Sequence, residues 1–224
     1  MRTQHKFTTL AIATILALSL TGQSSAASGH FTDLDHIQGK DQIETLYNNG
    51  FVRGMNDHEF QPNATLTSAQ GIQMIVNSFQ LSLAAIDFSV VPQATDLFTK
   101  VQDNAWYTDA FIIAYHNGVD LSADIDPAHK LTREEFTSYV IHGLEKESNL
   151  PLIRINPVDI TDKADLDIRY SGTIQIAVAL GIADLDEQGN FHPTTEISRA
   201  DAAIITYNAL EYLNAHPGQN VPSS

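Results

Sequence analysis

Hydrophobic residues recur at helical spacing in six stretches of the chain, and these stretches come in three pairs. The first stretch of each pair ends at a glycine, and the three glycines, Gly50, Gly118 and Gly181, lie 68 and 63 residues apart. A glycine directly after an apolar helical face is a common left-handed cap of a helix C-terminus. We therefore expect short helices over residues 41–49, 106–117 and 168–180.

The second stretch of each pair begins at a hydroxyl residue that lies five positions after a proline. The apolar positions after each hydroxyl fall on one helical face, and a residue able to complete or support a helix cap follows three positions later. These signals predict a longer helix at the end of each pair. The expected caps are Thr67 with Gln70, Thr132 with Glu135, and Ser198 with Asp201.

A single supersecondary unit used three times accounts for this pattern. A unit of about 50 to 65 residues would be marginal alone, which favours three units that share one core. The sequence has no cysteine, so burial has to hold the fold, and 43% of its residues are hydrophobic. The prediction is an all-α fold in which extended segments are short.

The first 26 residues have the layout of a secretory signal peptide. Arg2 and Lys6 precede an apolar run from Phe7 to Leu20, and Ala26 closes a segment of small residues. The run is short for a membrane-spanning helix. We therefore expect cleavage after Ala26 rather than retention as an anchor, and exclude residues 1–26 from the fold.

The mature chain is strongly acidic. Loss of Arg2 and Lys6 leaves 10 of the 12 basic residues against all 27 acidic ones, a formal charge of −17. Such a surface repels nucleic acid and anionic lipid at long range. Neither nucleic acid nor, after cleavage, a membrane is an expected partner.

The repeated motifs resemble those of the S-layer homology family. The best matches are Leu131–Glu135 and Ile197–Asp201, with Phe60–Pro62 and Phe191–Pro193 before two of the caps. Together the motifs recur in one order across the whole mature chain. The resemblance implies a pseudo-threefold bundle of three S-layer homology repeats, at residues 31–82, 97–147 and 157–214.

Members of this family are extracellular modules that anchor proteins to the cell wall. The resemblance implies that grooves between repeats bind an acidic, pyruvylated secondary cell-wall polysaccharide, with an arginine of the repeat motif as a main contact. The protein is then expected to be secreted and held at the cell wall or S-layer, with other wall or S-layer proteins as further candidate partners. The expected ligand-binding residues are Arg133, Arg199, Gly54, Thr132, Ser198 and Trp106.

Arg133 and Arg199 also need an explanation that is independent of the family. Each follows a helix cap, in a first turn where backbone N–H groups and the helix dipole already present positive potential. A carboxylate or phosphate would relieve this, and guanidinium suits planar bidentate recognition. The alternative is an ion pair with a nearby acid such as Glu134, Glu196 or Asp201. The residues alone leave both explanations open.

The three units differ at the positions that the family resemblance marks. Ser68 stands where the first unit would carry the arginine. Gly54, where the backbone would approach the sugar, is replaced by Ser122 in the second unit and by Leu185 in the third, and the loop of the second unit is three residues shorter than the other two. We therefore expect at most two competent grooves, one for each remaining arginine.

Other candidate chemistry is weaker. Trp106 has the helical register of Ala110 and Ile113, which favours core packing over stacking on a sugar. Residues 184–189 resemble the start of a calcium loop, but the twelfth position is Thr195 instead of a glutamate, which favours a plain turn. The histidines show no metal-binding spacing, and no cofactor is expected.

The sequence does not predict an enzyme. It has no motif of a serine nucleophile, a zinc protease or a phosphate-binding loop, and the three repeats occupy the mature chain, leaving no length for a catalytic domain. The alternative to wall anchoring is a degenerate repeat protein that acts as a secreted protein-interaction module without polysaccharide binding. The missing arginine of the first unit and the altered loop of the second keep that alternative open.

Overall fold

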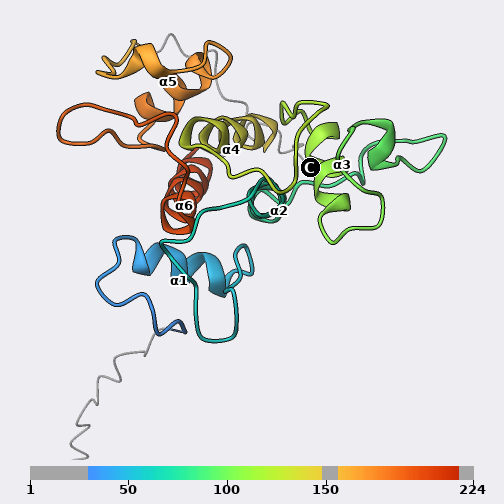
Figure 1. The fold of residues 1–224 in the computed structure, drawn as a ribbon, viewed down its shortest axis with the longest axis horizontal. Coiled ribbons are helices and arrows are strands. Elements are labelled where there is room, and N and C mark those ends of the chain that lie inside the picture. The colour runs from blue at the N-terminus through green and yellow to red at the C-terminus, as the bar shows by residue number, and fades with distance from the viewer. Residues whose placement is uncertain (1–29, 148–155, 217–224) are drawn as a thin grey trace, which may run out of the picture.

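The structure is a computed structural model that describes residues 30–147 and 156–216, and this part of the chain contains six α-helices and no strand. The all-α prediction is confirmed, and the predicted pairs are α1 with α2, α3 with α4, and α5 with α6 (Figure 1). The predicted signal peptide, residues 1–26, lies outside the described residues. The elements are α1 Lys40–Asn48, α2 Ser68–Ser78, α3 Thr108–His116, α4 Arg133–Glu147, α5 Ser171–Ala179 and α6 Arg199–Ala215, with the 3-10 turns η1 Ala94–Asp96 and η2 Lys163–Asp165.

The helix ends follow the sequence signals. Thr67 and Thr132 complete capping boxes, and the Ser198 hydroxyl accepts a hydrogen bond from the Asp201 N–H at 3.0 Å. These caps are confirmed as predicted. The glycines that follow the short helices, Gly50, Gly118 and Gly181, all have positive φ.

The three helix pairs meet around a closed ring of backbone hydrogen bonds. Leu66 donates its N–H to the Ile197 carbonyl (3.1 Å), Ile197 donates to Leu131 (2.9 Å), and Leu131 donates back to Leu66 (3.0 Å). All three side chains are buried. The residue before each cap therefore occupies an equivalent position around a pseudo-threefold axis.

Each long helix starts against the loop of another pair. The second N–H of α2, α4 and α6 donates to the carbonyl of Pro127 (3.0 Å), Pro193 (3.0 Å) and Pro62 (2.9 Å), respectively. The prolines found in the sequence pattern thus satisfy helix donors of a neighbouring unit. This explains why the spacing from proline to cap is constant.

The short helices pack across the boundaries between units. The long helices α2, α4 and α6 contact one another at the centre, while α1 packs on α6, α3 on α2 and α5 on α4 (Figure 1). Each short helix therefore covers the long helix of the preceding unit in cyclic order. The first and last helices of the described chain are neighbours, which closes the ring.

The expectation that Trp106 packs in the core is wrong. The helix predicted to start at Trp106 starts at Thr108, because the Thr108 hydroxyl donates to the Gln102 carbonyl (2.6 Å) and accepts from the Ala105 N–H (2.9 Å). These bonds fix a turn ahead of α3. Trp106 lies on that turn and is 65% exposed.

Candidate functional site

Arg199 at the start of α6 reaches into the loop of the first unit. The residue is only 5% exposed; its Nε donates to the Phe60 carbonyl at 2.8 Å and its Nη2 to the Arg53 carbonyl at 2.7 Å. The guanidinium carbon lies 4.5 Å from the centroid of the Phe60 ring. The two Asp33 carboxylate oxygens accept from the N–H groups of Phe60 (2.9 Å) and Gln61 (2.7 Å), which holds that ring in place.

The ion-pair alternative is wrong for both motif arginines. In the described ranges no carboxylate oxygen lies within 4 Å of a side-chain nitrogen of Arg133 or Arg199. Burial lowers the pKa of Arg199, and the more distant Asp33 carboxylate opposes this effect. Arg199 is thus a buried cation without an acidic partner in contact. Two carbonyl oxygens and the Phe60 ring stabilise its charge instead.

Three of the predicted ligand-binding residues line one groove. We call it the Arg199 groove; it encloses about 460 Å³ beside Gly54, Trp106 and Arg199, and these residues come from the first, second and third unit, respectively. The side of α2 that carries Gln70 and Gln73 forms another wall. The structure therefore joins residues that the sequence places as much as 145 positions apart, from Gly54 to Arg199.

The lining of the Arg199 groove has an unusual charge for this protein. It contains two arginines, Arg53 and Arg199, and no acidic residue among the described lining, although the chain carries 27 acids and a formal charge of −15. Arg53 was missed by the sequence analysis. The signal that could have found it is a basic residue inside the Gly50–Gly54 segment, where the third unit has Asp184.

Gly54 is required by its own loop. A Cβ at this position would lie 2.9 Å from the Glu59 carbonyl oxygen and would also meet the Asn56 carbonyl and the Phe31 ring. Packing within the first unit therefore explains this glycine without a ligand. A contact between its backbone and a sugar stays a prediction.

Arg133 occupies the equivalent position between the second and third units. Its Nη2 donates to the Asp184 carbonyl at 3.1 Å, and its guanidinium carbon lies 5.1 Å from the Phe191 ring centroid. The groove beside it encloses about 310 Å³. Burial lowers the pKa of Arg133, and nearby Asp201 and Asp184 oppose the shift.

The Arg133 groove differs from the Arg199 groove in its charge. Asp184, Asp186, Glu196 and Asp201 line it together with Arg133, so acids outnumber the cation. Leu185, which also lines the groove, stands in place of the loop glycine. An anionic ligand would meet more repulsion here than beside Arg199.

The loop that resembles the start of a calcium site forms a turn around the Asp186 carboxylate. The Asp186 carboxylate accepts hydrogen bonds from the N–H groups of Asn190 (2.8 Å) and Gln188 (2.9 Å) and lies 2.7 Å from His192 Nε2. These bonds, led by that from the Asn190 N–H, lower the pKa of Asp186 to about 2. Within the described residues no group of His, Cys, Asp and Glu side chains is arranged to hold a metal ion.

The third groove, between the first and second units, has been altered on both sides. Ser68 replaces the arginine and contacts the His129 carbonyl at 3.4 Å, and Ile125 replaces the phenylalanine over which an arginine would lie. Lys100 replaces the aspartate that clamps the loop in the other units and lies 3.9 Å from Asp126. The unit with the shorter loop therefore also lacks the aromatic ring and the loop-binding aspartate, and the arginine that would face them is missing.

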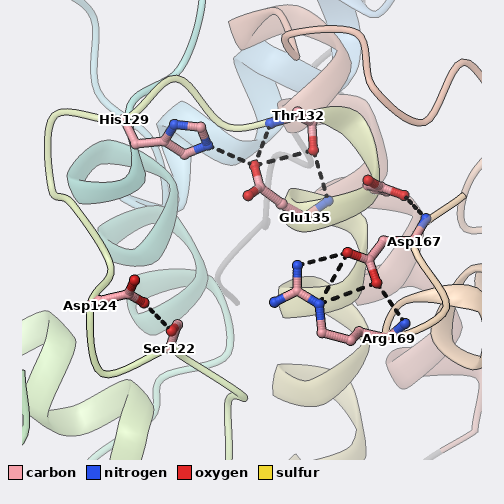
Figure 2. A network of polar contacts seen from close by, with 8 residues as sticks. Ser122, Asp124, His129, Thr132, Glu135, Asp167 and Arg169 are labelled. Carbon is pink, nitrogen blue, oxygen red and sulfur yellow. Dashed lines mark hydrogen bonds and ion pairs between the residues drawn. The ribbon is translucent and has the colours of Figure 1, made fainter.

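The polar contacts at this third groove are made within the protein. Figure 2 shows Glu135 between Thr132 and His129, and Arg169 against Asp167. The Arg169 Nη2 lies 2.7 Å from Asp167 Oδ2. The cations near this groove are therefore already paired with acids.

Thr132 and Ser198 are engaged in helix caps. The first three N–H groups of α6 donate to the Ala64 carbonyl (2.9 Å), the Pro62 carbonyl (2.9 Å) and the Ser198 hydroxyl (3.0 Å). The helix start therefore has no free N–H group in its first turn to offer an anion. Ligand contact by the hydroxyls of Thr132 and Ser198 stays a prediction.

A helical repeat protein with grooves at the junctions of its units has the architecture of a binding module. The S-layer homology domain family matches two stretches of the chain, residues 30–70 and 160–203. Gly54 and Phe60 belong to the first match and Arg199 to the second. Both matched segments, distant in sequence, therefore line the Arg199 groove, together with residues outside the matches such as Trp106.

The relatives of the chain include surface proteins and polysaccharide-degrading enzymes. It is 29% identical over 203 residues to an exoglucanase of Acetivibrio thermocellus, covering 88% of this chain and 18% of the enzyme. It is 26% identical over 219 residues to the surface-layer 125 kDa protein of Lysinibacillus sphaericus, covering 94% of this chain and 17% of that protein. An amylopullulanase of Thermoanaerobacterium thermosulfurigenes matches at 27% identity over 81% of this chain and 9% of its own length. The chain thus spans less than a fifth of each of these relatives.

Proposed function

We propose that this protein is held non-covalently at the bacterial cell wall. It binds an acidic, pyruvylated secondary cell-wall polysaccharide, and the binding site is the Arg199 groove. The observation that carries the proposal is the lining of this groove, which has two arginines and no acid on an otherwise acidic protein. A pyruvate ketal carries a carboxylate, which guanidinium groups recognise well. Trp106 offers an exposed ring for stacking on a sugar.

The relatives support the same proposal. They include a surface-layer protein and a cell surface glycoprotein of Acetivibrio thermocellus, and they share with this chain a region that is small compared with their own length. Such a shared region suits a common means of attachment better than a common reaction. We infer a location outside the cell, at the cell wall or S-layer, and no enzymatic activity for the described region.

The middle helix pair is proposed to be a third, divergent S-layer homology repeat. Its support is the closed ring of hydrogen bonds, in which Leu131 holds the same position as Leu66 and Ile197. We propose repeat boundaries at residues 31–82, 97–147 and 157–214. The third groove is altered, so we propose that this repeat contributes through its packing and by placing Trp106 beside the Arg199 groove.

The experiment is co-sedimentation of residues 27–224 with purified cell-wall sacculi, before and after chemical removal of the polysaccharide. We expect polysaccharide-dependent pelleting that weakens as salt is raised, because the recognition involves charges. Arg53→Ala removes an exposed cation from the groove and is expected to weaken binding about tenfold or more, as for loss of a charge-assisted hydrogen bond. Arg199→Ala is expected to abolish pelleting.

Arg169→Ala is the matched control, since it removes the same charge outside the Arg199 groove. It is expected to bind like the wild type, and Arg133→Ala to lose less than Arg199→Ala. Circular dichroism establishes that each variant is folded, which matters most for the buried Arg199. Equal pelleting by the wild type and the Arg53→Ala variant, or pelleting that survives polysaccharide removal, would contradict the proposal.

A protein-interaction role is the second candidate function. The connector between α2 and α3 exposes Val90 (79%) and Val91 (81%), which are apolar side chains that a protein partner would cover. This role predicts that pelleting depends on wall proteins instead of the polysaccharide. The same sedimentation assay, repeated with protease-treated sacculi, separates the two functions.

A further inference from the structure

A second cavity lies next to the Arg199 groove. It encloses about 380 Å³ between the C-terminal ends of α1 and α2 and one side of α6. We call it the Ser78 cavity; its lining includes Asn49, Phe51, Ser78, Gln80, Tyr207 and Asn214. It lies away from the caps and motif arginines that the family resemblance marks.

The polar groups of the Ser78 cavity have the character of a site for a neutral ligand. Ser78 is 2% exposed, and its hydroxyl has no hydrogen-bond partner among the described residues, which is costly unless a ligand or water supplies one. The amides of Asn49, Gln80 and Asn214 add donors and acceptors. Among the described residues the lining has a single charged side chain, Glu211, and no cation.

The apolar part of the cavity includes three aromatic side chains, of which Phe79 is buried and Phe51 and Tyr207 are half-buried. Phe51 and Tyr207 line it, and in the described part of the chain neither ring is paired with another aromatic ring. Half-buried aromatic faces together with amide and hydroxyl groups suit the apolar faces and the hydroxyls of a sugar ring. Glu211 would repel a sugar that carries a carboxylate.

The Ser78 cavity meets the Arg199 groove at Phe51, which lines both. On α2 the groove reaches Asn77 and the cavity begins at Ser78, the next residue. A ligand that extends beyond the groove in this direction would therefore enter the cavity. A polysaccharide is such a ligand, whereas a small anion is not.

We infer that the Ser78 cavity binds a neutral sugar unit of the same polysaccharide whose acidic unit binds in the Arg199 groove. This inference rests on the proposed function and deepens it. The protein then recognises two consecutive parts of the polymer, a carboxylate beside Arg199 and an uncharged sugar against Phe51 and Tyr207. Affinity for the polymer exceeds affinity for an isolated acidic sugar, because the second contact adds to the first.

Gln80 provides a test that does not depend on damaging the fold. Its backbone has φ of 51°, in the left-handed region that favours glycine. Gln80→Gly removes the amide from the cavity and relieves this backbone conformation. If Gln80 has only a structural role, this substitution should raise the stability of the protein and leave ligand binding unchanged. If Gln80 contacts the ligand, the variant should bind that ligand more weakly.

The experiment compares two ligands by isothermal titration calorimetry. One is the polysaccharide released from the sacculi of the bacterium that produces the protein, and the other is a single hexosamine glycoside that carries a pyruvate ketal. We expect Gln80→Gly and Tyr207→Ala each to weaken polymer binding about fivefold to tenfold, as for loss of a neutral hydrogen bond or a stacking contact, and to leave binding of the single sugar unchanged. The melting temperature of Gln80→Gly should be no lower than that of the wild type.

Tyr212→Ala is the matched control, because Tyr212 lies on the same helix but stacks on His216 outside the cavity. It should bind both ligands like the wild type. Unchanged polymer binding by Gln80→Gly and Tyr207→Ala, or an equal loss for both ligands, would overturn the inference and leave the Arg199 groove standing. Failure of the wild type to bind either ligand would instead overturn the proposed function, and this inference with it.

Discussion

Arg199 keeps its charge in a nearly closed position because the protein replaces its hydration shell. Carbonyl oxygens of Arg53 and Phe60 accept from two of its nitrogens, and the Phe60 ring covers one face of the guanidinium. No acid contacts Arg199 in the described structure, so its charge is not neutralised by an ion pair. The same bonds also tie the third unit to the first, so Arg199 has a structural and a proposed binding role.

At the residue scale, the Asp186 turn should respond to acid. Because the folded pKa of about 2 lies below the ordinary value of 3.8, the ionised carboxylate favours the folded state above about pH 3.8. That stabilisation is lost as the pH falls from 3.8 toward 2. We expect Asp186→Asn to melt below the wild type at pH 5, with the difference shrinking toward pH 2.

Thermal melting at a series of pH values measures this difference. Asp184→Asn is the control, since within the described residues only the backbone carbonyl of Asp184 accepts a hydrogen bond and its carboxylate accepts none. A difference between wild type and Asp186→Asn that stays constant from pH 5 to pH 2 would argue against the assignment.

Single residues were the hardest part to predict. Arg133 and Arg199 were found because they follow recognisable caps, but Arg53 lies in an irregular loop and has no such marker. Trp106 was misplaced because the helical spacing extends in the sequence ahead of Thr108, the residue at which α3 begins and whose hydroxyl fixes the preceding turn. Side-chain bonds of this kind override periodicity and leave little trace in the sequence.

At the element scale, the helices α2 and α4 cross closely at a glycine. A Cβ on Gly143 of α4 would lie 2.8 Å from a carbon of the Phe79 ring and 3.1 Å from a methyl carbon of Ile75. A helical Gly→Ala change ordinarily stabilises by about 1 kcal/mol. Here we expect the opposite sign, a loss of about 1 to 3 kcal/mol, because the added methyl overpacks the contact.

Gly172 of α5 is the matched control, since nothing lies within 4 Å of a Cβ built there. Gly172→Ala should leave stability unchanged or raise it by up to about 1 kcal/mol. Urea unfolding of both variants measures the two effects. A stabilised Gly143→Ala variant would contradict the close packing of α2 on α4.

Helix ends were the part of the fold that the sequence predicted best. Thr67, Thr132 and Ser198 mark three helix starts because a cap is a local interaction whose partners lie within three residues. Packing partners are not local in this way. The placement of α1 on α6 could not be read from the pattern, because any pair of apolar faces satisfies the same periodicity.

At the scale of the whole molecule, the ring of Leu66, Leu131 and Ile197 should make unfolding cooperative. Ile197→Ala removes a buried side chain at the axis and is expected to cost about 2 to 5 kcal/mol. Although Ile197 lies in the third unit, we expect the second unit to unfold with it. Trp106 fluorescence reports on the second unit, and far-ultraviolet circular dichroism reports on all helices.

Both signals should shift to the same lower urea concentration in the Ile197→Ala variant. Asn208→Ala, at a half-buried position of the helix α6 that follows Ile197, is a milder comparison that should also keep the two signals together. Separate transitions by fluorescence and circular dichroism would mean that the units unfold independently.

The packing of each short helix on the long helix of another unit links the three units to one another. The helix α1 packs on α6, α3 on α2 and α5 on α4, so every unit depends on contacts with another unit. The connecting segments keep the units of one chain close to one another, at a high effective concentration. A cut between α4 and α5 would remove that connection without removing any contact between helices. The two fragments would then form a complex whose stability depends on protein concentration, as in any assembly of separate subunits.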